Sequence, residues 1–336
     1  MNKKSEKNND LTLKIINLLN DKNHYTIGAL SQALATTTSK IKICLNQMLE
    51  LNVKIIHNDK GEYSLKTTVE LLECTAIQEL LTASIAKQLT QLWIFPLLDS
   101  TNQYLLNIAK QQLTTGVNAC FAEYQNAGRG RRGRGWYAPF AQSLLFSVLW
   151  PFQQSGEHLT GLSIAMGISL LRALEKLGIK GLALKWPNDL LYDNKKLAGI
   201  GIEAFTDSAG VCHAVIGIGL NTHKMPVNPQ ISQPFISLEE ISEAELSRNM
   251  LAATLLESLI IALNTFSTEG LAPFQSTWQA YDFLKDKPIT VHDAQHNTRS
   301  AIARGIHKDG SLIIEDESGQ LSFLQTGEVS VRVSFP

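Results

Sequence analysis

The segment from Gln125 to Trp136, QNAGRGRRGRGW, concentrates residues that are suited to holding an anion. Four arginines and four glycines share the eight positions 128–135. Arginine offers a permanently charged fork of N–H donors that suits carboxylates and phosphates, and glycine lets the backbone approach a ligand closely. Because like charges this close repel one another unless an anion gathers them, we predict an anion-binding loop that becomes ordered on its ligand.

Gly128, Gly130 and Gly133 also fit the pattern G-x-G-x-x-G of dinucleotide sites. That fingerprint requires the turn to lie between a strand and a helix. Here the apolar runs 118–124 and 143–150 flank the loop, and both are typical of strands. The strand-to-strand position excludes a Rossmann site. A basic patch for nucleic acid and a merely solvated charged loop remain alternative explanations of the loop taken alone.

A second polar cluster, Asp99 to Gln103, lies between the apolar run 92–98 and a helical segment that begins YLLNIAKQQ. Ser100 or Asp99 is expected to cap this helix. The same hydroxyls and the amides of the helix start could instead hold a polar ligand group.

A third cluster, WPND at 186–189, is flanked by two predicted strands, so Asn188 and Asp189 are either turn residues or site residues. Lys196 is expected in the tight hairpin turn 194–196 that precedes the strand 197–203. Glycines inside strand patterns often mark close approach by a ligand or by backbone. Such glycines are Gly199, Gly217 and Gly219.

The composition is that of a globular protein of two or three domains: 336 residues, 44% hydrophobic, 18% charged, with a net charge of −1. Any contact with nucleic acid must therefore come from a local patch. No uninterrupted apolar run reaches the roughly 18 residues of a membrane span, and the polar N-terminus lacks the apolar core of a signal peptide. The four cysteines are scattered, which favours reduced thiols in the cytoplasm.

The first 65 residues predict a small DNA-binding module. Helical spacing at 11–19, 27–34 and 41–49 is followed by a hairpin over 53–65, which together resemble a winged helix-turn-helix. Ser39, Lys40 and Lys42 would begin the recognition helix, and Lys60 would lie on the wing. A protein-contact module, or a vestigial one, is the alternative, because the recognition helix carries two lysines and no arginine.

Beyond this module we expect a helical connector, a strong helix, a polar surface excursion, two further helices and a small β-barrel of five short strands. These elements span, in order, 71–89, 159–177, 223–244, 246–266, 274–283 and the residues from 288 onward.

The arginine loop occurs in one chain, and in order, with the motifs DSTNQYL, KWPNDLLYDNKKLAGIGIE and IGIGLN. Together they resemble the bacterial biotin–protein ligases and, with the N-terminal module, the bifunctional form that also represses the biotin operon. The resemblance covers residues 10–332. It implies an α+β protein with a winged helix-turn-helix at 1–68, a central mixed-sheet biotin/lipoate ligase-like catalytic domain at 69–285, and a small C-terminal SH3-like β-barrel at 286–336.

The resemblance also implies the chemistry. Such ligases activate biotin with ATP, which is bound with Mg²⁺, to give biotinyl-5′-AMP, and they hold no permanently bound metal. They then pass biotin to a lysine of the biotin carboxyl carrier protein of acetyl-CoA carboxylase. The repressor form implies operator DNA as a partner and a homodimer promoted by the ligand. The reaction needs cations around a phosphorus and exclusion of water from a labile anhydride, and the arginine loop could supply both.

Carried over residue by residue, the resemblance assigns catalytic roles to Lys196, which bridges carboxylate and α-phosphate, to Arg131, and to Asp189, which orients or deprotonates the acceptor lysine. The biotin-binding residues are Ser100, Thr101, Asn102, Gln125, Arg129, Gly130, Arg131, Lys196 and Gly217. The ATP- and adenylate-binding residues are Arg131, Arg132, Trp136, Asn188, Gly219, Asn221 and Arg332. The DNA-binding residues are Ser39, Lys40, Lys42 and Lys60.

Two functions of other kinds compete with this assignment. A transcription factor that only senses biotin would release no pyrophosphate when biotin and ATP are added. A lipoate ligase would carry a different glycine-rich signature with a histidine, which this sequence lacks. Two departures from the family pattern also stand out: Gly135 replaces the common lysine, and the recognition helix is poor in arginine.

Overall fold

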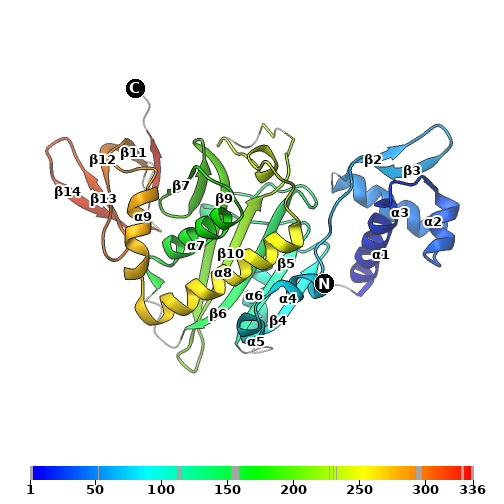
Figure 1. Ribbon diagram of the computed structural model, residues 1–336, viewed down its shortest axis with the longest axis horizontal. Coiled ribbons are helices and arrows are strands. Elements are labelled where there is room, and N and C mark those ends of the chain that lie inside the picture. The colour runs from blue at the N-terminus through cyan, green and yellow to red at the C-terminus, as the bar shows by residue number, and fades with distance from the viewer. Residues whose placement is uncertain are drawn as a thin grey trace.

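The computed structural model describes residues 3–51, 53–111, 116–152, 159–226, 228–229, 231, 233–292, 297–326 and 329–333. For residues 3–10 and for Arg132 it describes the backbone alone. The described chain forms three sheets, of three, seven and five strands, that follow one another along the sequence. In Figure 1 the three sheets lie in a row, with the seven-stranded central sheet in the middle.

The N-terminal module contains three helices and an antiparallel sheet of order β1-β3-β2. Thr26 and Thr37 cap the second and third helices, because each side chain accepts a hydrogen bond from a backbone amide in the first turn. The predicted helices and hairpin agree with these elements. Their bounds are α1 Lys3–Leu19, β1 Tyr25–Thr26, α2 Ile27–Ala33, α3 Thr38–Glu50, β2 Ile55–His57 and β3 Glu62–Leu65.

The predicted continuous helix over 71–89 is wrong. The chain runs without helix to Glu73 and then forms two short helices, α4 Cys74–Leu80 and α5 Ala83–Gln88. The break lies at Thr82, whose backbone N–H and hydroxyl both donate to the carboxylate of Glu257. A tertiary contact therefore overrides the local helical pattern, which the sequence of this segment alone could not show.

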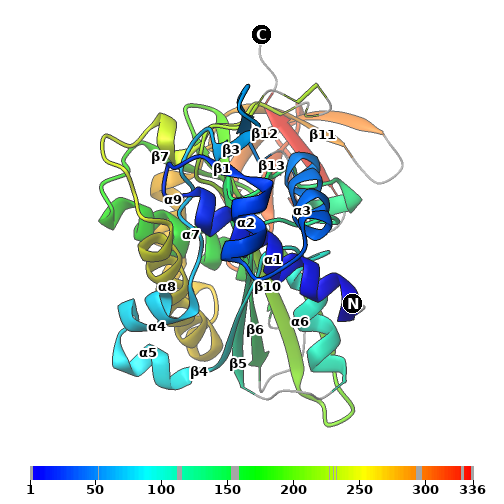
Figure 2. The same ribbon diagram turned by 90° about the vertical axis from the view of Figure 1, so that its right-hand side faces the viewer.

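The central sheet has the order β4-β5-β6-β10-β9-β8-β7; β4 and β5 are parallel, and all other neighbours are antiparallel. Figure 2 shows α4, α5, α7 and α8 on one side of the sheet and α6 on the other. The bounds are β4 Leu89–Phe95, α6 Thr101–Lys110, β5 Val117–Ala122, β6 Ser143–Phe152, α7 Leu162–Lys176, β7 Leu182–Lys185, β8 Asp189–Tyr192, β9 Lys195–Thr206, β10 Cys212–Asn221, α8 Arg248–Glu269 and α9 Gln275–Tyr281.

The two faces of the sheet differ because side chains alternate along a strand. On β10, Ala214, Ile216 and Ile218 join the main core. Val215, by contrast, packs in the cluster formed with α6. Gly217 and Gly219 lie two and four residues after Val215 on the same strand, so they face the same, α6 side of the sheet. That side carries the candidate site.

Helix α8 is long and apolar enough, by length and composition, to cross a membrane, with a mean hydropathy of 1.6 over 18 residues. The sequence led us to expect no such segment, because polar residues interrupt every apolar run. More than half of this window is buried within the protein. The helix packs against α7, where the Ser258 hydroxyl donates to the Ser169 carbonyl. Burial against its neighbours accounts for the composition of α8.

A buried ion pair joins the first turn of α8 to the end of β5. Arg248 and Glu123 are 1% and 2% exposed, and their side chains lie 2.7 Å apart. Arg248 also donates to the carbonyl of Glu70, and Leu72 N–H donates to the other carboxylate oxygen of Glu123 at 2.6 Å. The ion pair therefore holds the segment that leads out of the N-terminal module.

The core of the N-terminal module includes two residues from the central part of the chain, Phe140 and Ala141. Both are buried, and Phe140 N–H donates to the Leu51 carbonyl at the end of α3. The module is thus packed directly on the segment that follows the arginine loop.

The C-terminal five-stranded sheet has the order β14-β13-β12-β11-β15, with all neighbours antiparallel. Its buried side chains form one continuous core with those of the central sheet. Trp186 of the WPND turn donates from Nε1 to the Gly310 carbonyl at 2.9 Å, which fixes the two sheets together. The bounds are β11 Pro288–His292, β12 Thr298–Ile306, β13 Leu312–Glu315, β14 Leu321–Leu324 and β15 Ser330–Val333.

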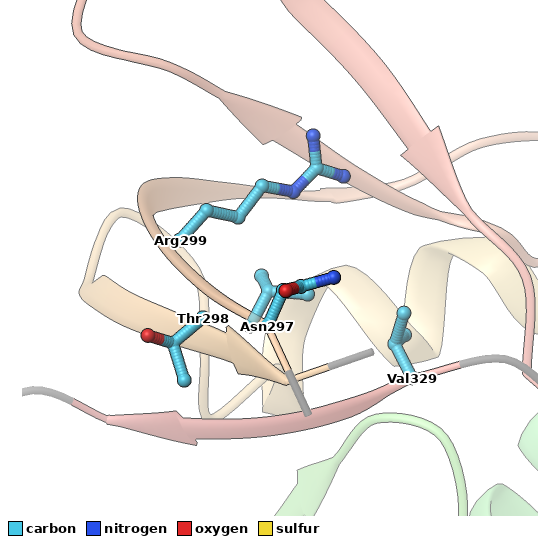
Figure 3. A pocket seen from close by; sticks show the side chains of 5 residues that line it. Asn297, Thr298, Arg299 and Val329 are labelled. Carbon is cyan, nitrogen blue, oxygen red and sulfur yellow. The ribbon is translucent and has the colours of Figure 1, made fainter. Parts of the chain in front are cut away.

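This sheet holds a small cavity of about 150 Å³, and Figure 3 shows the side chains that line it. It is lined by Val291, Asn297, Thr298, Arg299 and Val329. None of the predicted site residues contributes to it, so we place the site elsewhere.

Candidate active site

Pairs of glycines form the floor of the site. Gly217 of β10 lies opposite Gly201 on β9 and Ser147 on β6, and Gly219 lies opposite Gly199. A Cβ atom on Gly217 would lie 2.2 Å from Asn102 Oδ1, and one on Gly219 would lie 2.5 Å from Trp136 Cε2. The groups that approach these glycines are the side chains of Asn102 and Trp136, whereas the sequence pattern led us to expect a ligand or backbone.

Four of the residues predicted to bind biotin, Ser100, Thr101, Asn102 and Gln125, meet at the N-terminus of α6. Ser100 caps the helix, and Thr101 N–H donates to Gln125 Oε1 at 2.7 Å. Asn102 donates from Nδ2 to Glu203 at 2.9 Å. The structure thus brings together Thr101 and Gln125, which are 24 residues apart in sequence. Ser100 does cap the helix, as expected, and this leaves its neighbours free to form a polar cluster.

Ser147 organises this cluster and was missed in the sequence. It is fully buried, donates to Asn102 Oδ1 at 2.6 Å, and lies 2.6 Å from the Thr101 hydroxyl. A lone serine inside the apolar run SLLFSVLW was the available signal, because a buried hydroxyl needs a partner.

Replacing Ser147 by alanine should leave Asn102 without its donor and weaken biotin binding by roughly two- to tenfold, since one hydrogen bond contributes roughly 0.5–1.5 kcal/mol. We expect the Michaelis constant for biotin to rise while kcat changes little. Titration calorimetry and steady-state kinetics would check this. Ser169→Ala, which removes another buried hydroxyl on α7 behind the sheet, is the control, and an equal effect from both would refute the assignment.

Lys196 lies in strand β9, so its predicted position in a hairpin turn is wrong. The turn is Asp193–Asn194, where both residues have positive φ. Between the pairs Leu190–Ala198 and Leu191–Lys196 the register shifts, which leaves Leu197 as a bulge. Leu197 and Ala198 both enter the main core. The bulge therefore turns Lys196 to the glycine side of the sheet.

Near the Gly199–Gly219 pair of the glycine floor, Lys196 Nζ lies 2.6 Å from Asp189 Oδ1 and 5.2 Å from the Trp136 ring centroid. Trp136 Nε1 is buried and has no hydrogen-bond partner among the described residues. A buried donor without a partner fits a site that a polar ligand completes.

The polar excursion 223–244 has a structural role here that the sequence did not show. Lys196 N–H donates to the Pro234 carbonyl, and Ile236 N–H donates to the Lys196 carbonyl. Ile236 and Leu238 are buried. The segment therefore forms an added edge beside β9 that fixes the backbone of Lys196.

Lys185 is a further cation that the sequence reasoning left without a role. It lies opposite Asp189 across β7 and β8. Burial lowers the pKa of Lys185; Asp189 opposes that shift, and the charges of Lys196, Arg332 and Arg134 add to it. A neighbouring anion would favour the charged form of this lysine. Arg332 itself is exposed on β15, so the C-terminal sheet contributes charge to the site.

The arginine loop joins β5 to β6, strand to strand, as predicted. It is closed by bonds from Trp136 N–H to the Gly128 carbonyl and from Gly130 N–H to the Arg134 carbonyl, and Arg129 pairs with Gly135. Arg131 donates to the carbonyl of Thr326, which follows β14 of the C-terminal sheet. The side chain of Arg132 lies outside the described residues.

Asn188 and Asn221 hold backbone in place. Asn188 Nδ2 donates to the Ile200 carbonyl at 2.7 Å, and Asn221 Nδ2 donates to the carbonyls of Lys196 and Ile236. Both donors of the Asn221 amide are engaged, so its side-chain oxygen remains for an adenylate, whereas Asn188 keeps one N–H and its oxygen. Contact of either residue with an adenylate stays a prediction.

The four residues predicted to bind DNA lie in the N-terminal module. Ser39, Lys40 and Lys42 are exposed near the start of α3, and Lys60 is exposed in the turn between β2 and β3. In Figure 1 the module lies at the opposite end of the molecule from the C-terminal sheet.

Comparison with known proteins identifies the family. Residues 94–221 match the model of the biotin/lipoate A/B protein ligase family. The chain is 35% identical over 328 residues to the bifunctional ligase/repressor BirA of Escherichia coli, which covers 97% of this chain and 98% of that protein. The chain belongs to the bifunctional biotin–protein ligases and repressors. It is also 29% identical to a biotin–[acetyl-CoA-carboxylase] ligase of Paracoccus denitrificans over 66% of this chain and 93% of that protein.

A solved structure supports the fold. The biotin protein ligase of Aquifex aeolicus, in complex with biotin and ATP, matches with a TM-score of 0.61 at 24% identity over 73% of this chain and all of that one. The mixed central sheet is thus the fold of a biotin ligase catalytic domain.

Proposed function

We propose that the glycine floor and the cation cluster are the two ends of one substrate site. There the chain makes biotinyl-5′-adenylate from biotin and ATP and passes biotin to a lysine of a carboxylase carrier domain. The observation that carries this division is the Lys196–Asp189 pair at 2.6 Å, beside Lys185 and at the end of a floor without side chains. Biotin lies over the floor, and the phosphates face the cations.

In the first half-reaction the biotin carboxylate attacks the α-phosphorus of ATP and pyrophosphate leaves. Lys196 and Arg131 stabilise the charge that develops on the carboxylate and phosphate oxygens, and Lys185 adds to that field. Mg²⁺ bound with ATP would supply charge that neutralises the leaving pyrophosphate. Ser100, Thr101, Asn102 and Gln125 hold biotin, and Arg129, Gly130 and Gly217 border it. Trp136, Gly219, Asn221, Asn188, Arg132 and Arg332 serve the adenylate.

In the second half-reaction the acceptor lysine attacks the carbonyl carbon of the adenylate, and AMP leaves. Asp189 accepts a proton from the acceptor ammonium or orients the amine. Incubation of the purified protein with biotin, Mg²⁺–ATP and biotin carboxyl carrier protein tests both steps. Pyrophosphate release and a biotinylated carrier are expected, and biotin binding without either product would indicate a sensor.

Replacing Arg131 by alanine should weaken biotin binding and speed the loss of adenylate to water. The reason is that the loop loses both a charge and its contact with the Thr326 carbonyl. We expect a change of at least about tenfold in each, because hydrogen bonds from charged groups contribute roughly 1.5–3 kcal/mol. Limited proteolysis within 126–136 should be faster in the free protein than with biotin and ATP. Equal cutting in both states would contradict ligand-dependent ordering.

We further propose that the N-terminal module, 1–68, is a winged helix-turn-helix and that the C-terminal sheet, 286–336, is an SH3-like barrel, with the catalytic domain at 69–285. Three helices followed by a hairpin support the first assignment, and five short antiparallel strands support the second. We place the protein in the cytoplasm, where its carrier substrate is made.

Repression is expected to require a ligand-promoted homodimer. Ordering of the arginine loop lowers the entropic cost of docking a neighbouring subunit, so adenylate should favour the dimer. Two modules then contact two half-sites, with Lys40, Lys42 and Lys60 at phosphates. A gel shift on the protein's own upstream DNA should show at least about tenfold tighter binding with biotin and ATP. Ligand-independent binding would contradict the coupling.

A further inference from the structure

Helix α3 presents a face whose chemistry suits base edges as well as phosphates. Its buried side is formed by Ile41, Cys44, Leu45 and Met48. On the opposite side Ser39, Ile43 and Asn46 follow one another at spacings of four and three residues, and all three are exposed. Ile43 is 55% exposed, so its side chain is available to a partner.

The charges around this stripe indicate how α3 would enter a groove. Lys40 and Lys42 lie near its N-terminal end, and Lys60 lies on the adjacent hairpin, where all three can meet phosphates. Glu50 ends the helix, and its carboxylate would be repelled by phosphates. The N-terminal two thirds of α3, which carries the stripe, is therefore the part that approaches the bases.

The composition of the N-terminal module limits which base contacts it can make. The first arginine of the chain is Arg129, so residues 1–68 contain none. Arginine on guanine is the commonest specific contact in the major groove. This module must recognise its site by other means, and the stripe offers two of them. A branched apolar side chain packs on the C5-methyl of thymine, and an asparagine amide pairs with N6 and N7 of adenine.

We infer that α3 recognises A·T base pairs in the major groove, with Ile43 against a thymine methyl and Asn46 on an adenine. The inference rests on the proposed repressor function and names the bases that this function would recognise. The Asn46 amide has no hydrogen-bond partner within the part of the chain that the structure describes. Both side chains are therefore available to a duplex.

The test uses the full-length protein with biotin and Mg²⁺–ATP. Half-sites are first selected from a random duplex library. In the selected duplex each thymine is then replaced by uracil, which lacks only the methyl, and each adenine by 7-deazaadenine, which lacks the N7 acceptor. Affinities are measured for the wild type, Ile43→Ala, Asn46→Ala and, as a phosphate-contact control, Lys42→Ala. Carrier biotinylation should be unchanged in all three variants, which shows that they are folded.

We expect A·T pairs in the selected half-site. One uracil substitution should weaken the wild type about fourfold, since burying one methyl contributes about 0.8 kcal/mol, and should not affect Ile43→Ala. One 7-deazaadenine should weaken the wild type at least about fivefold and should not affect Asn46→Ala. Lys42→Ala should weaken binding to every duplex and reduce its salt dependence.

Four outcomes would overturn the inference: equal uracil penalties in the wild type and Ile43→Ala, equal 7-deazaadenine penalties in the wild type and Asn46→Ala, a half-site of G·C pairs, or binding without sequence preference. The last outcome would leave DNA binding itself intact. Absence of all DNA binding in an active ligase would overturn both this inference and the repressor function, and would leave the enzyme unaffected.

Discussion

Replacing Lys196 by alanine is expected to slow adenylate formation by about 10²–10³-fold, since loss of one preorganised contact to transition-state charge costs roughly 3–4 kcal/mol. The fold should survive. The bulge at Leu197 and the backbone bonds to Pro234 and Ile236 do not use the lysine side chain. Asp189 keeps a second cationic neighbour in Lys185. Pyrophosphate release in single-turnover experiments is the direct measurement.

Lys195 provides the matched control, because it is the adjacent lysine, is exposed, and lies in the same strand. Lys195→Ala should adenylate biotin at the wild-type rate. If the two variants behaved alike, the ammonium at 196 would have no special role. Free amines such as hydroxylamine should also capture biotin from the wild-type adenylate but none from Lys196→Ala, since that variant makes too little adenylate.

Replacing Arg248 by alanine should destabilise the protein by about 3–5 kcal/mol, because it leaves Glu123 buried as an uncompensated charge. The same change removes the donor to the Glu70 carbonyl at the exit from the N-terminal module. Chemical denaturation followed by circular dichroism would measure the free energy of unfolding. Activity per folded molecule should be largely retained, because Arg248 is buried and is not one of the predicted site residues.

A surface arginine of the C-terminal sheet gives the comparison. Arg304 contacts both Asp286 and Glu315 at 2.7 Å but is 36% exposed. Arg304→Ala should lower the free energy of unfolding much less than Arg248→Ala, because solvent screens exposed ion pairs. Similar losses for the two variants would show that burial of the Arg248 pair is not what makes it important.

Much of the site could be predicted from the sequence where the chemistry leaves a local pattern. Alternate glycines within apolar strands predicted a floor of close approach, and the glycine–arginine alternation predicted a loop between strands. Both features follow from period-two strand geometry and from residue type. These two predictions could be made locally, because neither feature depends on what packs against the segment.

What the sequence did not show depends on distant contacts. Lys196 was expected in a turn because the sequence does not mark the bulge at Leu197, which is set by pairing with β8. The helix over 71–89 is broken by Glu257, which is 175 residues away from Thr82. Ser147 and Lys185 gain their roles only from the strands and side chains that surround them.

Phe140 and Ala141 complete the hydrophobic core of the N-terminal module. A shortened chain that began near residue 68 would therefore present this phenylalanine to water, next to the partly buried Leu97 and Tyr124. A new apolar patch of this kind promotes self-association. Anyone who wishes to use the catalytic part alone as a labelling reagent should pair the truncation with a polar residue at position 140. Solubility, rather than catalysis, would be the first property to suffer without it.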